Sequence, residues 1–187
     1  MPSELSELLE KLAQAFDRHA IPYMVIGGQA VLIHGAPRMT ADVDVTVGID
    51  VDRLDDVLAV AHELDWQARV PNPREFAERT MVLPLKDSSG AGVDVMFSRF
   101  DYERHAIRRT VPIRVGAADV RYASAEDLVV HKVFAGRARD LDDALSVLAK
   151  KPDIDIGYIR HWLGALGRSV DEDVLPRLDA LLARLKR

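Results

Sequence analysis

The chain has 187 residues, of which 48% are hydrophobic and 29% charged, with a net charge of -5 and no cysteine. This size and apolar content predict one domain, or one small domain with a helical appendage, and the missing cysteine excludes disulfides, thiolate metal sites and a cysteine nucleophile. No segment approaches the roughly 20 apolar residues of a membrane span, and the acidic, amphipathic N-terminus is unlike a signal peptide. We therefore expect a cytoplasmic protein.

One stretch of this acidic chain is basic. Residues 99–139 contain nine Lys or Arg side chains and five Asp or Glu side chains, which gives the stretch a charge of +4. A local basic region can bind an anionic ligand, and it can equally be a solvated surface.

The first half of the chain predicts alternating helices and strands. Leucines at helical spacing predict a helix over residues 4–18, followed by a strand over 23–27 and a helix over 28–35 that starts directly after two glycines. Residues 42–47 read Asp-Val-Asp-Val-Thr-Val, which predicts a strand with valines on one face and polar side chains on the other.

The middle of the chain predicts one more helix and a hairpin. Apolar residues at helical spacing predict a helix over 51–64, and the Pro-rich segment 70–76 predicts a loop. Residues 80–86 and 92–98 bracket a turn sequence and predict an antiparallel hairpin. Two shorter strands are expected at 111–115 and 119–123.

From Ser124 onward the pattern is helical. Ser124 begins a helix-start signature and is expected to cap a helix that runs to about residue 137. Further helices are predicted over 140–151, 157–167 and 171–187, with Pro176 in the first turn of the last helix or kinking it. The prediction is thus an α+β fold, with a mixed-sheet domain over 1–123 and a helical C-terminal segment over 124–187 packed against it.

Three aspartates are candidates for a metal site. Asp42 and Asp44 lie two residues apart on one face of a strand, and Asp94 points away from the apolar face of its own strand in the same manner. Carboxylate oxygens suit Mg²⁺ or Mn²⁺, whereas the six histidines have no zinc-binding spacing. The alternative is an ordinary exposed strand face, since Asp-x-Asp is common in such positions.

The combination of these features resembles a known family. An apolar strand, Gly27-Gly28, thirteen residues, Asp-Val-Asp and a third Asp on a later strand are similar to the nucleotidyltransferase superfamily of DNA polymerase β. The Arg-x-Thr-x-Asp-x-Asp form over 38–44, and the segment 126–143 with its lysine followed by Arg-Asp and Asp, resemble small bacterial nucleotidyltransferases that include AbiEii-type abortive-infection toxins. The resemblance covers about residues 20–150.

The resemblance implies a minimal nucleotidyltransferase sheet and an NTP-dependent, pyrophosphate-releasing enzyme that uses Mg²⁺, with Mn²⁺ as the alternative. ATP is among the triphosphates that it would bind. The implied metal ligands are Asp42, Asp44 and Asp94, and the implied nucleotide contacts are Gly27, Gly28, Arg38, Thr40 and Lys132. Lys132 is expected to contact the triphosphate or to be a surface lysine. Asp140 and Asp143 would complete the site or position Lys132, and Arg38 would contact phosphate, brace the Asp strand or form a simple salt bridge.

Two other functions remain open from the sequence. The protein could be a catalytically silent member of the fold that binds a nucleotide or a partner, for example as half of a toxin–antitoxin pair, or a Rossmann-like module that binds a dinucleotide. The acceptor of an active enzyme could be an RNA or tRNA end, a protein hydroxyl or a small molecule.

Overall fold

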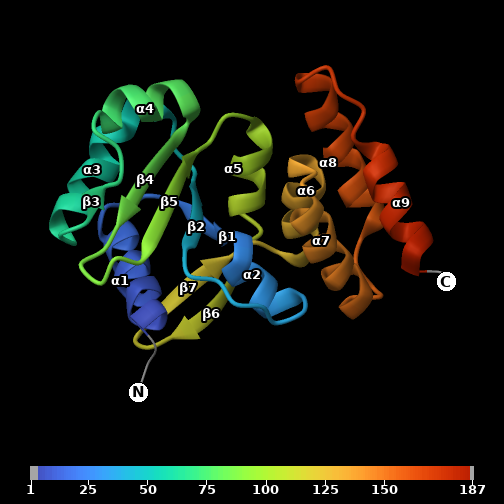
Figure 1. Cartoon of the computed structure of the whole chain (residues 1–187), viewed down its shortest axis with the longest axis horizontal. Coiled ribbons are helices and arrows are strands. Elements are labelled where there is room, and N and C mark those ends of the chain that lie inside the picture. The colour runs from blue at the N-terminus through green and yellow to red at the C-terminus, as the bar shows by residue number, and fades with distance from the viewer. Residues whose placement is uncertain (1–3, 186–187) are drawn as a thin grey trace. The chain divides into compact units, whose positions relative to one another are not determined.

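The computed structural model describes residues 4–185, and these form two compact units (Figure 1). The first unit contains residues 4–29 and Met39–Tyr122, and it holds every strand of the described chain. The second unit contains Ala30–Arg38 and residues 123–185, and it is helical. The division falls within helix α2 (Gly27–His34).

The first unit is built on one mixed sheet of seven strands, in the order β3-β4-β5-β2-β1-β7-β6. Its central strand β2 pairs antiparallel with β1 and parallel with β5, and β4 and β5 form the predicted antiparallel hairpin. The strands span Tyr23–Ile26 (β1), Val43–Val47 (β2), Gln67–Ala68 (β3), Val82–Lys86 (β4), Gly92–Phe97 (β5), Val111–Val115 (β6) and Ala118–Tyr122 (β7).

Alternating side chains give this sheet a buried face and a partly open face. Val43, Val45 and Val47 of β2 are fully buried, as are Val93 and Val95 of β5. The period of two then places the acidic residues of both strands on the opposite face. The same alternation buries the leucines of β4, leaves Val82 and Pro84 half-buried and exposes Lys86.

Four helices and one 3-10 turn surround the sheet within the first unit: α1 (Glu4–Arg18), η1 (Val51–Arg53), α3 (Leu54–Glu63), α4 (Pro73–Thr80) and α5 (Asp101–Ile107). Helix α1 has the predicted bounds and packs against β6 and β7. The prediction of a loop over 70–76 was wrong, because α4 begins inside it. Pro73 occupies the first helical position, where its fixed φ suits a helix and its missing N–H costs nothing.

Helices α6 (Ala125–Ala135), α7 (Ala138–Lys150), α8 (Ile156–Ser169) and α9 (Leu175–Leu185) form most of the second unit. Helix α6 packs against α7 and α8, and α9 packs against α7 and α8 (Figure 1). The predicted cap is confirmed, because Ser124 Oγ accepts a hydrogen bond from Asp127 N at 3.1 Å. Pro176 lies in the first turn of α9; residues 186–187 of the predicted last helix lie outside the described residues.

The mixed sheet with flanking helices confirms the predicted α+β class. It also excludes the Rossmann-like alternative, because β1 and β2, which flank the glycine turn and α2, run antiparallel rather than as a parallel β-α-β unit. Across residues 4–185, every helix falls short of the length and apolar content that a membrane crossing requires.

Candidate functional site

Asp44 of β2 lies directly opposite Asp94 of β5 in the parallel register of these neighbouring strands. Adjacent strands are about 4.8 Å apart, so the two carboxylates share one region of the open sheet face. Asp42 is two residues before Asp44, at the entry to β2, and is exposed, whereas Asp44 and Asp94 are half-buried. The structure thus brings the three predicted acids to one face of the first unit.

The glycine turn is shaped around Asp44. Gly27 has a φ of +61°, which strains any residue with a side chain, and a Cβ atom built there would lie 1.8 Å from Asp44 Oδ2. The carboxylate therefore lies directly against the backbone at the start of α2. The first N–H groups of a helix have no partner within the helix, so this turn offers hydrogen-bond donors to an anion.

Gln29 adds a buried polar group to the same turn. Its side chain is 5% exposed, and its Nε2 has no hydrogen-bond partner among the described residues. A buried donor without a partner costs about 1 to 3 kcal/mol, so a native structure rarely keeps one without a reason. An acceptor atom of a bound ligand would satisfy it.

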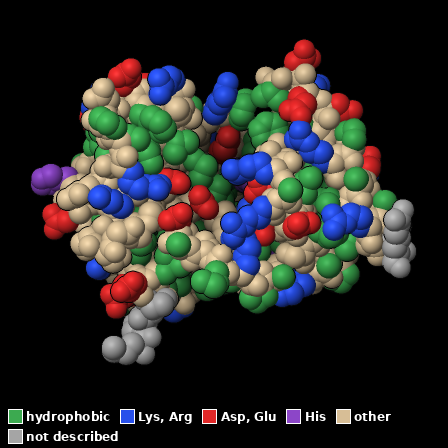
Figure 2. Space-filling view, in the orientation of Figure 1, with side chains coloured by type: hydrophobic (Ala, Val, Ile, Leu, Met, Phe, Trp, Pro, Cys, Tyr) green, Lys and Arg blue, Asp and Glu red, His purple; other side chains and the backbone are tan. Residues whose placement is uncertain are grey.

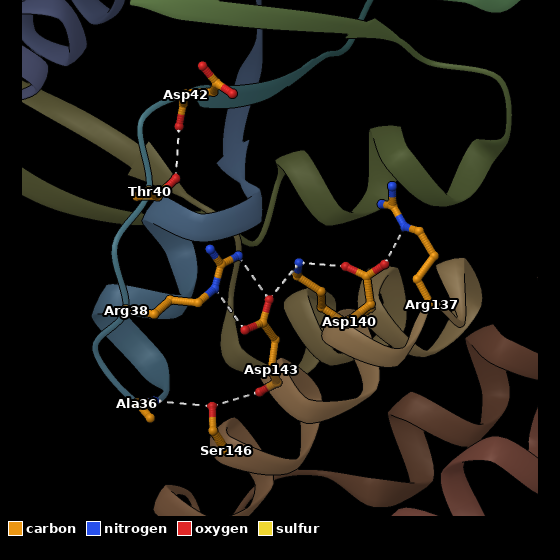
Figure 3. Close-up of polar contacts among 9 residues, drawn as sticks. Ala36, Arg38, Thr40, Asp42, Arg137, Asp140, Asp143 and Ser146 are labelled. Carbon is orange, nitrogen blue, oxygen red and sulfur yellow. Dashed lines mark hydrogen bonds and ion pairs between the residues drawn. The ribbon is translucent and has the colours of Figure 1, made fainter.

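A second glycine, Gly92, makes room for Asp42. A Cβ atom at residue 92 would lie 2.4 Å from Asp42 Oδ1 and 3.5 Å from Arg69 Cζ, so the carboxylate and the guanidinium border the same space. Thr40 supports this end of β2, because its Oγ1 donates a hydrogen bond to the backbone oxygen of Asp42 at 3.2 Å (Figure 3).

Arg69 is a member of this site that the sequence did not reveal. Its Nη2 donates to Asp94 Oδ1, and the two side chains are 37% and 32% exposed, so solvent reaches the ion pair. Arg69 lies directly after the two-residue strand β3, where its backbone N–H donates to Pro84 O at 2.9 Å. No motif marks this arginine, because only the pairing of β3 with β4 brings it to the acids.

The three aspartates have the right chemistry for Mg²⁺ but are not gathered as a metal cage. Among residues 4–185, no three Asp, Glu or His side chains lie close enough together to hold one ion. The reason is visible in the contacts: Asp94 is turned to Arg69, and Asp42 lies against Gly92. Three carboxylates on one partly open face, each carrying hard oxygen atoms, nevertheless fit Mg²⁺ or Mn²⁺.

A second polar cluster lies in the helical unit, around Lys132 of α6. Lys132 is 7% exposed, and its Nζ contacts Asp140 Oδ1 at 2.8 Å and Asp143 Oδ2 at 2.9 Å, both from α7. Because Asp140 and Asp143 are three residues apart on one helix face, they bind the ammonium together. The alternative of a surface lysine is therefore wrong, since Lys132 is buried.

Arginines complete this cluster on both sides (Figure 3). Arg38 donates from Nε and Nη2 to the two oxygens of Asp143, at 2.9 and 3.0 Å, and Arg137 donates from Nε to Asp140 at 2.6 Å. Ser146 links the same segments, because its Oγ accepts from Ala36 N at 3.1 Å. The salt-bridge alternative thus describes the observed position of Arg38.

The electrostatics of the cluster favour the ionised form of Asp140. Burial raises the pKa of Asp140, but the hydrogen bonds and the positive charges of Lys132 and Arg137 together lower it by more, so its pKa lies below the ordinary value. Four of the side chains are buried or half-buried, and among these the two positive charges of Lys132 and Arg38 equal the two negative charges of Asp140 and Asp143. With the exposed Arg137 the cluster carries one net positive charge, and it links α6, α7 and the segment after α2.

Much of the basic stretch over residues 99–139 is paired with acids from elsewhere in the chain. Arg104 contacts Asp50, and Arg121 contacts Asp17. Arg108 and Arg109 follow the end of α5 at Ile107, so they do not extend a basic helix face. The stretch is therefore not one continuous array of unpaired cations.

Comparison with known proteins identifies the family and the fold of the chain. The family model described as nucleotidyltransferase of unknown function (DUF6036) matches residues 3–165. No curated protein matches the chain in sequence.

Three solved structures share the fold at low sequence identity. The antibiotic-resistance factor ANT(2″)-Ia in solution has a TM-score of 0.62 at 13% identity, covering 91% of this chain and 95% of that one. An antigenic nucleotidyltransferase-like protein from Paracoccidioides brasiliensis has a TM-score of 0.56 at 20% identity, covering 98% and 94%. The lincomycin-bound lincosamide antibiotic adenylyltransferase LnuA has a TM-score of 0.52 at 13% identity, covering 78% and 96%.

Proposed function

Because the chain belongs to the family of nucleotidyltransferases of unknown function DUF6036, we propose that it transfers a nucleoside monophosphate from a nucleoside triphosphate to a hydroxyl group. The observation that carries the proposal is the register that sets Asp44 opposite Asp94, with Asp42 two residues earlier and the glycine turn against Asp44. An ordinary exposed strand face would need neither the paired acids nor the close contact at Gly27.

In this proposal the triphosphate lies on the turn at Gly27 and Gly28, where backbone N–H groups and the start of α2 favour negative charge. Gln29 follows this turn directly in the chain, and we propose its buried Nε2, which lacks a partner among the described residues, as a further donor to the triphosphate. Asp42, Asp44 and Asp94 would hold Mg²⁺ or Mn²⁺, which neutralises phosphate charge when it is bound.

The chemistry then requires little beyond positioning. The acceptor oxygen attacks the α-phosphorus in line, the bond from that phosphorus to the bridging oxygen breaks, and pyrophosphate leaves. A carboxylate oxygen of Asp94 takes the proton of the acceptor hydroxyl, since the half-buried side chain is open to solvent on one side.

The remaining roles stay predictions. Arg38, Thr40 and Lys132 are predicted nucleotide contacts, and Asp140 is predicted to act through Lys132, whose ammonium it binds. A small hydroxylated molecule is the acceptor that we favour, because one structure of similar fold is an adenylyltransferase with lincomycin bound. An RNA or tRNA end and a protein are the alternative acceptors; a toxin role with an antitoxin partner is likewise still a prediction.

The test is calorimetric titration of each of the four NTPs, with and without Mg²⁺, into the wild type and an Asp42→Asn/Asp44→Asn variant. We expect Mg²⁺-dependent binding to the wild type and its loss in the variant. The control is Asp52→Asn/Asp101→Asn, which removes the same charge from two exposed positions off the sheet and should bind like the wild type.

Equal binding to the wild type and to the Asp42→Asn/Asp44→Asn variant would place the nucleotide elsewhere and overturn the assignment of the site. If nucleotide binds but no labelled acceptor forms from small molecules, RNA or protein, the catalytically silent binding protein becomes the better description.

A further inference from the structure

A hollow of about 420 Å³ lies beside Asp94 in the first unit. Apolar side chains line most of it, and Figure 2 shows hydrophobic side chains gathered on the surface over α4 and β4. The lining residues include Arg69, Val70, Phe76, Val82, Pro84 and Asp94.

The strand register explains why apolar groups lie next to a reactive acid. Pro84 of β4 pairs with Asp94 of β5, so both side chains point to the same face, and Val82 lies two residues before Pro84 on that face. Phe76 of α4 also lines the hollow. These side chains are half-buried rather than covered, which leaves an apolar surface open directly beside the carboxylate.

The hollow is lined by one cation, Arg69, and one anion, Asp94, and the Asp42 carboxylate borders the same space as the Arg69 guanidinium. The guanidinium of Arg79 lies 5.9 Å from the centre of the Phe76 ring. Arg69 uses Nη2 to bind Asp94, and a guanidinium has five N–H donors, so Arg69 can bind a second anion without leaving Asp94. Asp94 already has Arg69 as its cationic partner, so it does not require a cationic group on the ligand.

We propose that this hollow binds the acceptor, and that the acceptor is a small molecule with a hydroxyl group, an apolar ring and an anionic group. The proposal rests on the proposed function. The ring lies on Phe76, Val82 and Pro84, the carboxylate or phosphate of the acceptor binds Arg69, and the hydroxyl lies at Asp94. The volume is in the range of small-molecule sites, about 300 to 1,000 Å³.

The arrangement also sets specificity. In the transfer step the acceptor oxygen bonds to the α-phosphorus, pyrophosphate leaves with the electrons of the broken bond, and Asp94 takes the hydroxyl proton. A polycationic acceptor would meet Arg69 and Arg79 on entry, so the hollow selects against it.

The experiment follows backbone amide shifts of ¹⁵N-labelled full-length protein on addition of small probes. The probes are 4-hydroxyphenylacetate and (4-hydroxybenzyl)phosphonate, which carry the two kinds of anion, neutral 2-(4-hydroxyphenyl)ethanol, and cationic tyramine. We expect shifts at Val70, Phe76 and Val82, with the two anionic probes binding at least fivefold more tightly than tyramine. The stronger of the two identifies the preferred anion. Tyramine binding as tightly as the anions, or no shifts in the hollow with any probe, would overturn the proposal.

Two variants separate the anion contact from general packing. Arg69→Met should weaken both anionic probes by about fivefold and leave the neutral probe unchanged. Arg74→Met is the matched control, because Arg74 is an exposed arginine of α4 that pairs with Asp55 and does not line the hollow. An equal loss of affinity for the anionic probes in both variants, or no loss in Arg69→Met, would contradict the role of Arg69.

The same samples distinguish this proposal from the proposed function. Mg²⁺ and ATP are titrated after each probe, and the Asp42→Asn/Asp44→Asn variant is included. Probe binding without ATP binding would count against the nucleotidyltransferase and leave a binding hollow, whereas ATP binding without probe binding would overturn only the acceptor hollow.

Discussion

The carboxylate of Asp44 lies where a side chain at Gly27 would begin, since a Cβ there would be 1.8 Å from Asp44 Oδ2. The backbone of the glycine turn and the central acid of the sheet therefore constrain each other. Residue 27 needs both a positive φ and the absence of a side chain. The effects of these two requirements can be separated by comparing a substitution at Gly27 with one at a glycine that has only the positive φ.

Gly27→Ala should lower the free energy of unfolding by more than the roughly 1 to 3 kcal/mol of a strained φ, and it should abolish Mg²⁺-dependent nucleotide binding. Gly90→Ala is the control, because Gly90 also has a positive φ of 92° but has no atom within 4 Å of a built Cβ. Urea unfolding and NTP titration of both variants measure the difference. Equal effects would show that contact with Asp44 is unimportant.

Gln29→Met should stabilise the ligand-free protein by about 1 kcal/mol, because it replaces a buried amide that lacks a partner with an apolar group of similar volume. The same substitution should weaken nucleotide binding if the amide is a ligand contact. Thermal unfolding with and without Mg²⁺ and ATP gives both quantities. A destabilised variant would mean that the amide is satisfied in solution, for example by water.

Lys132→Met should lower the free energy of unfolding by roughly 3 to 5 kcal/mol, because it leaves Asp140 and Asp143 buried with one cation fewer. Arg137→Met should cost less than about 1 kcal/mol, because the Arg137 side chain is 80% exposed although it binds the same Asp140. Chemical unfolding of the two variants tests this ranking. Similar losses would show that the burial of Lys132 is unimportant.

Acid should destabilise the fold between pH 6.5 and pH 4 through His131. Burial is the main cause that lowers the pKa of His131 to about 4. In the unfolded chain His131 has its ordinary pKa of about 6.5, so below this pH the unfolded chain binds a proton at His131 and the folded protein does not. The free energy of unfolding therefore falls by up to about 3 kcal/mol over this range.

Urea unfolding of the wild type and of His131→Gln at pH 7.5, 5.5 and 4.5 measures this contribution, and the variant should lose part of the pH dependence. Burial also lowers the pKa of His34, which adds to the same trend and remains in the variant. The ionised state of Asp140 contributes in a lower window, because its stabilisation is lost as the pH falls from the ordinary pKa of an aspartate through the depressed pKa of the folded protein. An unchanged pH profile in His131→Gln would refute the prediction.

Local patterns predicted the strands that carry the acids. Alternation of valine with aspartate fixes which face of β2 and β5 each side chain occupies, because strand geometry has a period of two. The hairpin partner of β5 was also readable from its turn sequence. Helix α4 was missed because its proline-rich start resembles a loop, although Pro73 is well placed as a first helical residue.

The sequence by itself was enough to predict the aspartates as candidate metal ligands, the glycine turn, the resemblance to nucleotidyltransferases and the capped start of α6. Each of these depends on short-range periodicity or spacing. Only the tertiary structure decided that Asp44 faces Asp94, that Arg69 binds Asp94 beside an apolar hollow, and that Lys132 is buried between two aspartates. These relationships depend on strand order and helix packing, which join residues that the chain keeps apart and which no local pattern encodes.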